Sequence, residues 1–591
     1  MERQKIIAPM LYVAFIVALL APRLSALDSF STLDEPYWLS MGANFYYALG
    51  QREFQNTVYE YQPAITTMWI VTAAMLVYFP EYRGFGQGYL DYNKGWLDPF
   101  LRDHGKDPLA LLQISREIQV FIVVILFLIL FYLLQRFVPK PVAAFAILFA
   151  SFDPFFLGQS RLLDHEAMLS LFVIVSVLAL ALYLSQDRRP AFLLLSGVAA
   201  GFAQLTKSSA MAIFAPVGVL LLVQIVQEKN FFKSLKIFAL WLVALVATYF
   251  IFWPGMWVAP QKMLYEVYGN AFSYAFQGGR LAVTGELQTS RFSLDLNFAG
   301  MWELTKILLM RTTPLTWLGV LFGCALPFAP TRERIGARGY LFPSLLISAA
   351  AFILMFGIAQ GRNSPHYILC SYLALNLFAG LGWFYFIQRL TFQKWDADER
   401  GKTRIESVFQ KIPRSSAFIR VLYKFFQPAA LFVALFLQLS SAMTYYPYYF
   451  TYQSFGRGAA FPSFPYGEGL ELAGQYLAKQ PNAKDSTALV YYSRGCFSYF
   501  YPGLTNGFRP YYVDGAHSQD LLREIKSADY LVVYYAAQGQ LDKYAGYIEA
   551  LSAVKPIHEV WLNGRKYVII YQVDSIPDSV FEALANLKPL P

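Results

Sequence analysis

Long apolar runs separated by polar loops fill the first three quarters of the chain. A helix needs roughly 17 to 25 mostly apolar residues to cross a bilayer. Eleven segments meet this measure: residues 6–22, 118–137, 141–157, 167–184, 190–205, 209–226, 235–253, 313–330, 340–358, 366–387 and 425–443. The pattern therefore predicts an α-helical polytopic membrane protein with about 11 transmembrane helices.

The distribution of Lys and Arg predicts the orientation of these spans. With the N-terminus in the cytosol, the cytosolic loops are rich in basic residues, above all the loop 388–424. The short outer loops then hold only Arg161, Lys207 and Arg362. This asymmetry follows the positive-inside rule and leaves residues 23–117 and 254–312 as two long outward-facing segments.

Residues 62–79 are also apolar enough to span the membrane. Counting them as a span would turn every later basic loop outward, against the rule that orients the other helices. We therefore expect a helix that lies in, or dips into, the outer interface and packs against the bundle.

The pattern changes after the eleventh span, where the chain stays outside to its end. Three segments have the composition of β-strands, at residues 486–493, 528–535 and 566–573, and two helical patterns lie at 467–480 and 518–527. Asn563-Gly564 suits the tight type I′ turn of a hairpin. We expect a transmembrane domain at residues 1–445 and a small extracytoplasmic α/β domain within 446–591, folded from about residue 465.

Composition agrees with a membrane protein. Of 591 residues, 56% are hydrophobic and 15% are charged, against about 25% charged in soluble domains. The net charge of +9 does not indicate nucleic-acid binding, because the basic residues border apolar segments. The three cysteines are far apart and predict neither a disulfide framework nor a zinc site. Ala21-Pro22-Arg23 is a poor cleavage site, so the first apolar run is expected to be retained as a helix.

An acidic pair, Asp34-Glu35, opens the first outer segment and is followed by Pro36 and a helical pattern. One interpretation is structural, with Asp34 as the N-cap and the proline in the first turn. That interpretation gives no role to Glu35.

A second acidic group, Asp164-His165-Glu166, lies beside Arg161 at the outer mouth of the third and fourth spans. Ionisable residues cost about 2.5–3.5 kcal/mol each at the centre of a membrane helix and less near its end. An interfacial helix cap is the structural interpretation. The functional one is that Asp164 and Glu166 face Asp34 across an outer cavity, where they serve a divalent cation or proton transfer.

The outer cations Arg161, Lys207 and Arg362 are predicted on the same membrane face as both acidic groups. Each has a structural interpretation as an interfacial anchor. Cations beside carboxylates at headgroup depth also suit a phosphorylated lipid, because they bind phosphate and stabilise the charge of a leaving group. His366-Tyr367 either adds a donor to such a site or caps the tenth span.

The order of these parts resembles the GT-C fold membrane glycosyltransferases of glycosyltransferase family 39, the protein O-mannosyltransferase and lipid A aminoarabinose transferase type. The resemblance covers roughly residues 5–390 and rests on the order and spacing of short motifs. They are LDEPYW from residue 33, YQPAITTMW from 61, RLLDHEAML from 161, GFAQLTKSSA from 201 and SPHYIL from 364. Gln62-Pro63 departs from the His-Pro or Pro-Pro of relatives, so Gln62 is only a candidate substrate contact, as are His366 and Tyr367.

The resemblance implies transfer of a sugar from a polyprenyl-phosphate donor to an acceptor hydroxyl on a protein, glycan or lipid, with inversion. By carry-over Asp34 is the general base, and Glu35 assists it or orients the acceptor. Asp164, His165 and Glu166 complete the acidic site, where Asp34, Asp164 and Glu166 are the ligands that a divalent cation would take. Lys207, with Arg161 or Arg362, holds the donor phosphate. No Walker A or GxGxxG motif points to a nucleotide instead.

Two other classes of protein are alternatives to a glycosyltransferase. A transporter or lipid flippase typically carries midplane charges in broken helices and shows internal repeats, neither of which the sequence displays. A structural subunit with a degenerate membrane part would not need both acidic motifs and the outer cations. A prokaryotic plasma membrane is the expected location, with the endoplasmic reticulum as the eukaryotic equivalent.

Overall fold

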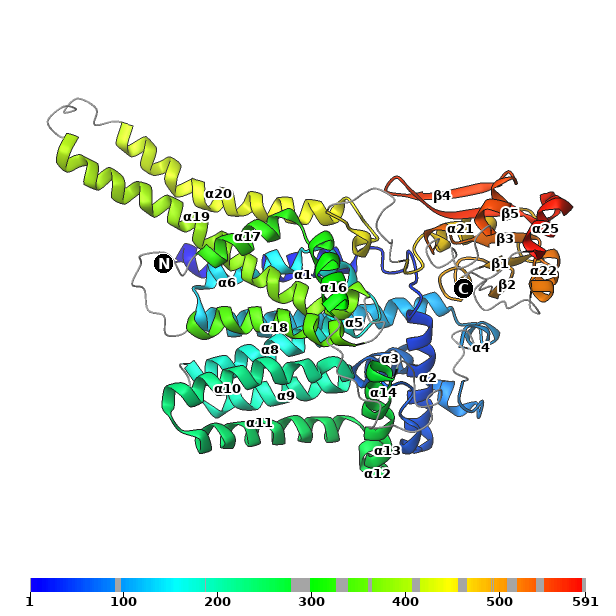
Figure 1. Ribbon diagram of the computed structural model, residues 1–591, viewed down its shortest axis with the longest axis horizontal. Helices are drawn as coiled ribbons and strands as arrows, with labels where there is room; N and C mark the ends of the chain where they lie inside the picture. The colour runs from blue at the N-terminus through cyan, green and yellow to red at the C-terminus, as the bar shows by residue number, and fades with distance from the viewer. Residues whose placement is uncertain are drawn as a thin grey trace.

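A bundle of long apolar helices and a small mixed sheet at one end of it make up the chain (Figure 1). The computed structural model describes residues 2–90, 97–185, 188–277, 298–325, 338–359, 364–405, 415–454, 465–490, 492, 494–507, 518–537 and 547–586.

The bundle is built from helices that match the predicted spans. They are α1 (Glu2–Leu24), α5 (Pro108–Phe137), α6 (Lys140–Ser151), α8 (Glu166–Ser185), α9 (Pro190–Thr206), α10 (Phe214–Glu228), α11 (Phe231–Phe252), α17 (Pro314–Ala325), α18 (Arg338–Ile358), α19 (Leu369–Ile405) and α20 (Ser415–Met443). Within the described residues, seven helices are long and apolar enough to cross a membrane, or eight if the bent pair α16–α17 counts as one. The chain is a multi-pass membrane protein, as predicted. The count of about 11 is only approximate, because the apolar parts of α1, α6 and α9 are shorter than the other spans.

The predicted third span, residues 141–157, is not one continuous helix. It breaks between α6 and α7 (Pro154–Gln159) at Asp153. The Asp153 carboxylate accepts the backbone N–H of Phe156 at 2.9 Å and so caps α7, and Pro154 opens its first turn. Proline lacks the N–H that a continuous helix needs, which explains the break.

Two other predicted boundaries also differ. The eighth span, 313–330, starts at Pro314, where α17 meets α16 (Phe298–Arg311) at 110°, and residues 326–330 lie outside the described residues. The predicted cytosolic loop 388–424 is largely helical, since α19 continues to Ile405 and α20 starts at Ser415. Figure 1 shows these two helices projecting together beyond the rest of the bundle.

Shorter elements gather at the opposite end. They are α2 (Glu35–Gln51), η1 (Phe54–Asn56), α3 (Ile65–Tyr78), η2 (Pro80–Gly84), α4 (Leu97–Asp103), α12 (Gly255–Val258), α13 (Pro260–Leu264), the π-helical η4 (Tyr265–Gly269) and α14 (Asn270–Phe276). Figure 1 shows α2 running across the ends of the long helices. The helix predicted at 62–79 is α3, which packs against α2, α5 and α9. Its lying in the membrane plane stays a prediction.

Short 3₁₀ turns also lie at the ends of several spans. They are η3 (Ser208–Ile213), η7 (Pro365–Ile368) and η8 (Tyr449–Thr451). The first leads from α9 into α10, and the second leads into α19. The turn η3 follows Lys207, and η7 contains the His366-Tyr367 pair, so both lie at positions that the sequence singled out.

The predicted C-terminal α/β part is confirmed. Its sheet has the order β2-β1-β3-β5-β4, from β1 (Thr487–Val490), β2 (Leu504–Gly507), β3 (Tyr530–Val533), β4 (His558–Leu562) and β5 (Arg565–Gln572). Strand β1 is parallel to β2 and β3, whereas β5 is antiparallel to β3 and β4. Asn563 and Gly564 have φ of 49° and 77°, as a type I′ hairpin turn requires. Its helices are α21 (Leu470–Leu477), α22 (Ser518–Lys526), α24 (Tyr547–Ser552) and α25 (Asp578–Ala585).

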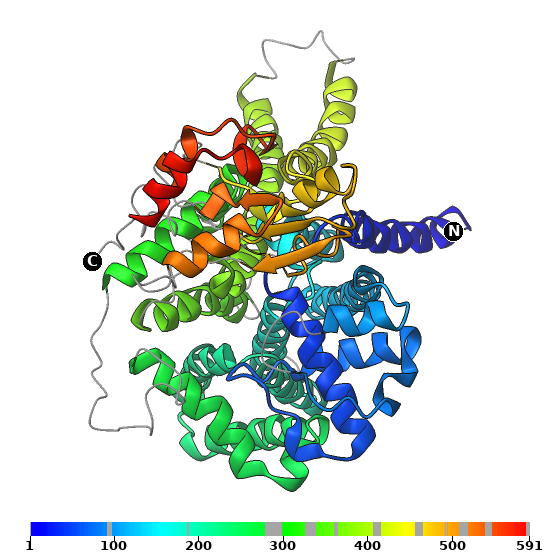
Figure 2. The ribbon, with the colours of Figure 1, turned by 90° about the vertical axis from the view of Figure 1, so that its right-hand side faces the viewer.

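The sheet part docks on the same end of the bundle as α2 and α4 (Figure 2). A Cβ added to Gly495, whose φ is +71°, would overlap the ring of Pro36 in α2. Arg102 of α4 donates to the carbonyl of Ser498 at 2.9 Å. The N-terminus of α2 is therefore covered by residues that lie hundreds of positions away in sequence.

Glycines bring α17 and α19 into close contact. A Cβ built on Gly382 would lie 2.6 Å from the backbone nitrogen of Gly323 and closer still to the carbonyl oxygen of Gly319. Gly319 and Gly323 have the small-xxx-small spacing that lets membrane helices approach.

We expect Gly382→Ala to destabilise the protein by about 1–3 kcal/mol, because an extra methyl group must push two backbones apart. Gly218→Ala in α10 is the matched control, since nothing lies within 4 Å of its added Cβ. Thermal unfolding of the two variants in detergent measures the difference. A G382A melting temperature equal to that of G218A would contradict the close contact.

Candidate functional site

Side chains from four separate segments converge at the covered end of the bundle. Asp34 precedes α2, Asp164-His165-Glu166 leads into α8, and Lys207 joins α9 to η3. His366 and Tyr367 belong to η7. Four side chains of this set are buried, each with at most 4% of its surface exposed: Asp164, His165, Glu166 and Lys207.

Asp34 occupies the N-cap position of α2 but makes no side-chain capping hydrogen bond. Its Oδ2 instead accepts the hydroxyl of Tyr466, which donates at 3.1 Å. The same hydroxyl lies 3.4 Å from Oδ2 of Asp164. The two carboxylates that the sequence placed on one face are therefore neighbours, joined through one phenol.

Lys207 and Glu166 form a buried ion pair between Nζ and Oε1. The ammonium group also lies over the ring of Tyr367, 4.6 Å from its centroid. Glu166 stands in the first turn of α8, where the helix dipole favours a negative charge. Two of the three ammonium donors of Lys207 remain for other acceptors beside Glu166.

His165 lies between the two acids of its own motif. Its Nδ1 is 3.2 Å from Oδ1 of Asp164, and its ring stands edge-on to Trp38 at 4.9 Å. Burial, followed by the charges of Lys207 and His366, holds the pKa of His165 well below its ordinary value. The imidazole is therefore neutral at pH 7, so its contact with Asp164 is not an ion pair.

Burial raises the pKa of Asp164 to about 8, and the nearby Glu166 and Asp34 carboxylates add to the shift. Lys207 and the N–H of His165 act in the opposite direction. Asp164 is therefore largely protonated at neutral pH.

Comparisons with known proteins place the chain by sequence and by fold. A family model described as dolichyl-phosphate-mannose-protein mannosyltransferase matches residues 113–253, which include the Asp164-His165-Glu166 motif and Lys207. No curated protein matches the sequence. A crystal structure of ArnT from Cupriavidus metallidurans bound to undecaprenyl phosphate aligns with a TM-score of 0.50 at 14% identity, covering 95% of this chain and 98% of that one. The chain has the GT-C glycosyltransferase fold.

Two further structures resemble this GT-C chain more loosely. The oligosaccharyltransferase AglB from Archaeoglobus fulgidus aligns with a TM-score of 0.40 at 12% identity, over 91% of this chain and 70% of that one. The Pmt1-Pmt2 complex of S. cerevisiae aligns with a TM-score of 0.32 at 16% identity, over 49% and 38%.

Glu35, the second half of the acidic pair, has a different environment from Asp34. Arg116 of α5 binds it bidentately, with Nε 2.6 Å from Oε1 and Nη2 2.5 Å from Oε2. It also accepts the N–H groups of Thr32 and Leu163 at 2.8 and 2.7 Å. Burial alone would raise the pKa of Glu35, but Arg116 and these donors hold it below its ordinary value. Glu35 thus joins the start of α2 to the loop before α8.

Arg161 lies apart from Lys207 in the GT-C structure. Its Nη2 donates to the carbonyls of Ser25 and Ala26, and its guanidinium lies 5.3 Å from the ring centroid of Tyr449. It holds the loop after α1 to the segment after α20. Sequence reasoning could not give the direction of the Arg161 side chain, and its membrane face stays a prediction.

The remaining candidate residues are Gln62, Arg362 and His366. Gln62 donates to the hydroxyl of Tyr61 at 3.2 Å and has no contact with Asp34 or Lys207 among those described here. Arg362 falls outside the described residues. His366 stands near the cluster, with its ring 5.7 Å from that of Tyr466.

Three residues of the site were missed by sequence reasoning. Arg116 and Gln119 share one face of α5, and Gln119 donates to the carbonyls of Leu162 and Asp164. Two polar residues three positions apart at the start of an apolar helix were an available signal. Tyr466 had no signal, because nothing in the sequence indicates that it meets Asp34.

The donor set does not fit a divalent cation in this arrangement. No group of three or more His, Cys, Asp and Glu side chains in the described parts of the chain has the geometry to hold a metal ion. Lys207 occupies the position beside Glu166, and Tyr466 lies between the other two carboxylates.

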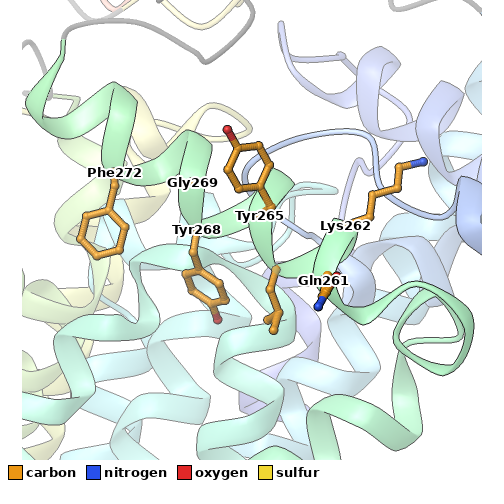
Figure 3. Close-up of a pocket in the computed structure, with 7 residues that line it drawn as sticks. Gln261, Lys262, Tyr265, Tyr268, Gly269 and Phe272 are labelled. Carbon is orange, nitrogen blue, oxygen red and sulfur yellow. The ribbon is translucent and has the colours of Figure 1, made fainter. Parts of the chain in front are cut away.

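A surface hollow elsewhere does not belong to this cluster. Gln261, Lys262, Leu264, Tyr265, Tyr268, Gly269 and Phe272 line it, from α13, η4 and α14 (Figure 3). None of its lining residues is one of the acids or cations described above.

We expect Arg116→Met to destabilise the protein by about 3–5 kcal/mol, because it leaves Glu35 buried without its cation. The double variant Glu35→Gln with Arg116→Met should lose less than the sum of the two single variants. Arg136→Met on the same helix, whose guanidinium donates to the exposed hydroxyl of Tyr132, is the control. Denaturation in detergent measures all four, and additive losses would refute the coupling.

Proposed function

We propose that this chain transfers a sugar from a polyprenyl-phosphate donor to an acceptor hydroxyl at the outer face of the membrane, with inversion. The observation that carries the proposal is that half-buried Asp34 meets buried Asp164, Glu166 and Lys207 in one cluster. A carboxylate beside a fixed ammonium group suits a reaction in which the carboxylate accepts a proton and the ammonium group stabilises a leaving phosphate.

Asp34 is the proposed general base. Its carboxylate takes the proton of the acceptor hydroxyl while the acceptor oxygen bonds to the anomeric carbon. The bond between that carbon and the phosphate oxygen breaks, and the electron pair leaves with the polyprenyl phosphate. Of the two neighbouring acids, Asp34 is the better base, since Asp164 holds its proton at neutral pH.

Lys207 is the proposed partner of the donor phosphate. Glu166 and the ring of Tyr367 fix the direction of its ammonium group. The charge on the phosphate oxygen grows as the bond breaks, so a preorganised cation stabilises the transition state more than the bound donor. The likeness to ArnT, a protein solved with undecaprenyl phosphate, supports this class of lipid.

A buried donor without a partner supports the binding of a polar substrate beside the acidic cluster. Trp38 Nε1 has no hydrogen-bond partner within the described structure, and the Trp38 ring touches His165. A buried N–H group without a partner is costly, and hydroxyl groups of a bound sugar would satisfy it.

The proposal extends to the location and the acceptor class. Lipid-linked donors of this kind fit a cell-envelope enzyme of a prokaryotic plasma membrane, with a protein, glycan or lipid as acceptor.

Asp34→Asn should lower the rate of sugar transfer by roughly 10²–10⁴-fold, because the amide cannot accept the proton. Asp28→Asn is the control, since it makes the same change at an exposed position in the same loop. The assay measures consumption of radiolabelled polyprenyl-phosphate sugars by purified protein. Full activity of D34N, with D28N also active, would overturn Asp34 as the base.

Lys207→Met should raise the KM for the donor about tenfold or more, because a charge-assisted contact to phosphate is lost. Arg161→Met provides the contrast: it removes a buried cation that binds backbone carbonyls instead. R161M should lower the melting temperature while the donor KM stays unchanged. If K207M keeps the wild-type donor dependence, Lys207 has no role in binding the phosphate.

A further inference from the structure

Tyr466 stands at the start of the C-terminal part, yet its ring packs into the core of the membrane bundle. The residue is 5% exposed and belongs to the same buried cluster as Trp38 and Met168. Its ring lies 5.9 Å from that of Phe450 and 5.7 Å from that of His366. The sheet has its own separate core, so Tyr466 reaches out of the part of the chain that carries it.

The backbone of Tyr466 is held from both sides. Its carbonyl accepts the N–H of Leu33, the residue before Asp34, at 3.1 Å. Its own N–H donates to Oε2 of Glu468 at 2.7 Å, and Tyr534 of the sheet part donates to the same oxygen at 3.1 Å. Docking of the C-terminal part and placement of the phenol are therefore one event.

The Tyr466 hydroxyl can link the two acids by hydrogen bonds that run from Asp164 to Tyr466 and from Tyr466 to Asp34. Burial, with the charges of Asp164 and Asp34, raises the pKa of Tyr466 well above its ordinary value, so the hydroxyl keeps its proton. A hydroxyl has one proton to give and can accept another. The protonated Asp164 can donate to the phenol oxygen while the phenol donates to Asp34, at the 3.4 and 3.1 Å separations observed.

We propose that Tyr466 is a positioning residue of the active site, and that the C-terminal domain completes that site by holding Asp34 and Asp164 through this hydroxyl. The inference rests on the proposed function, in which Asp34 is the base. A hydrogen bond donated to a carboxylate favours its ionised form, which is the form that accepts a proton from the acceptor.

Other charged and titratable groups face the same pair. Glu166 and Lys207 approach Asp164 from α8 and the end of α9, and His165 donates its N–H to Asp164 at 2.6 Å. Glu35 and His366 complete the surroundings, from α2 and η7. Because these groups interact, Asp34 and Asp164 titrate together with shared apparent pKa values. The test below measures those apparent pKa values.

The test compares Tyr466→Phe with Tyr448→Phe in the full-length protein. Tyr448 is also a buried phenol that donates to a carboxylate, that of Glu471, but it does not touch Asp34 or Asp164. Y466F should lower kcat roughly 10- to 100-fold with little change in donor KM. The acid limb of its kcat/KM profile should move up by roughly one pH unit. Y448F should lower the melting temperature and leave the acid limb where it is.

An unchanged acid limb and kcat in Y466F, or equal shifts in both variants, would overturn the proposal and leave a structural role only. Failure of the proposed function is distinguishable, because then the wild-type protein and D34N would be equally inactive. Infrared difference spectroscopy of the carboxyl band, assigned by its loss in D34N and D164N, follows the same titration without turnover. An identical band titration in wild type and Y466F would equally overturn the proposal.

Discussion

The bidentate ion pair of Glu35 and Arg116 fixes the candidate site. Arg116 also donates to the carbonyls of Leu27 and Phe30, and Glu35 also accepts the N–H of Leu163. One guanidinium and one carboxylate thereby join α5, the start of α2 and the loop before α8. Asp34 and Asp164 are the next residues along two of these segments, so their separation follows from this pair. A buried charge pair of this kind contributes little net stability, but it specifies one arrangement of the segments around it.

Only part of this arrangement could be predicted from sequence. Ionisable residues at the mouths of apolar helices are rare and costly, and that rule found Asp34, Asp164, Glu166 and Lys207. The same rule assigned Arg161 to the phosphate, because it gives the depth of a residue and not the direction of its side chain. Glu35 was paired with Asp34 by adjacency, whereas a helix start turns consecutive side chains to different partners. Tyr466 could not be found, since its contact with Asp34 depends on how a distant domain docks.

The fold, like the site, could be predicted only in part from the sequence. Span positions follow from hydrophobicity and length alone, and the strands and hairpin of the sheet follow from composition and Asn563-Gly564. The break at Asp153-Pro154 was signalled by a cap followed by a proline, and a window that averages hydropathy passes over it. The extension of α19 to Ile405 was missed because polar composition was taken to mean a loop. Charge decides where a helix leaves the membrane, and helix propensity decides where it ends.

Charge balance links the base and the phosphate contact. Lys207 is the cation that acts on Asp164, and it is already paired with Glu166. In the proposed reaction a donor phosphate would share the ammonium group with Glu166 and add negative charge beside Asp164. A neutral Asp164 lowers the repulsion that the incoming phosphate meets, whereas an ionised Asp164 would oppose it. In the proposed reaction the proton on Asp164 favours donor binding, while the hydrogen bond from Tyr466 favours the ionised form of Asp34. Two neighbouring acids can serve opposite needs when their surroundings differ.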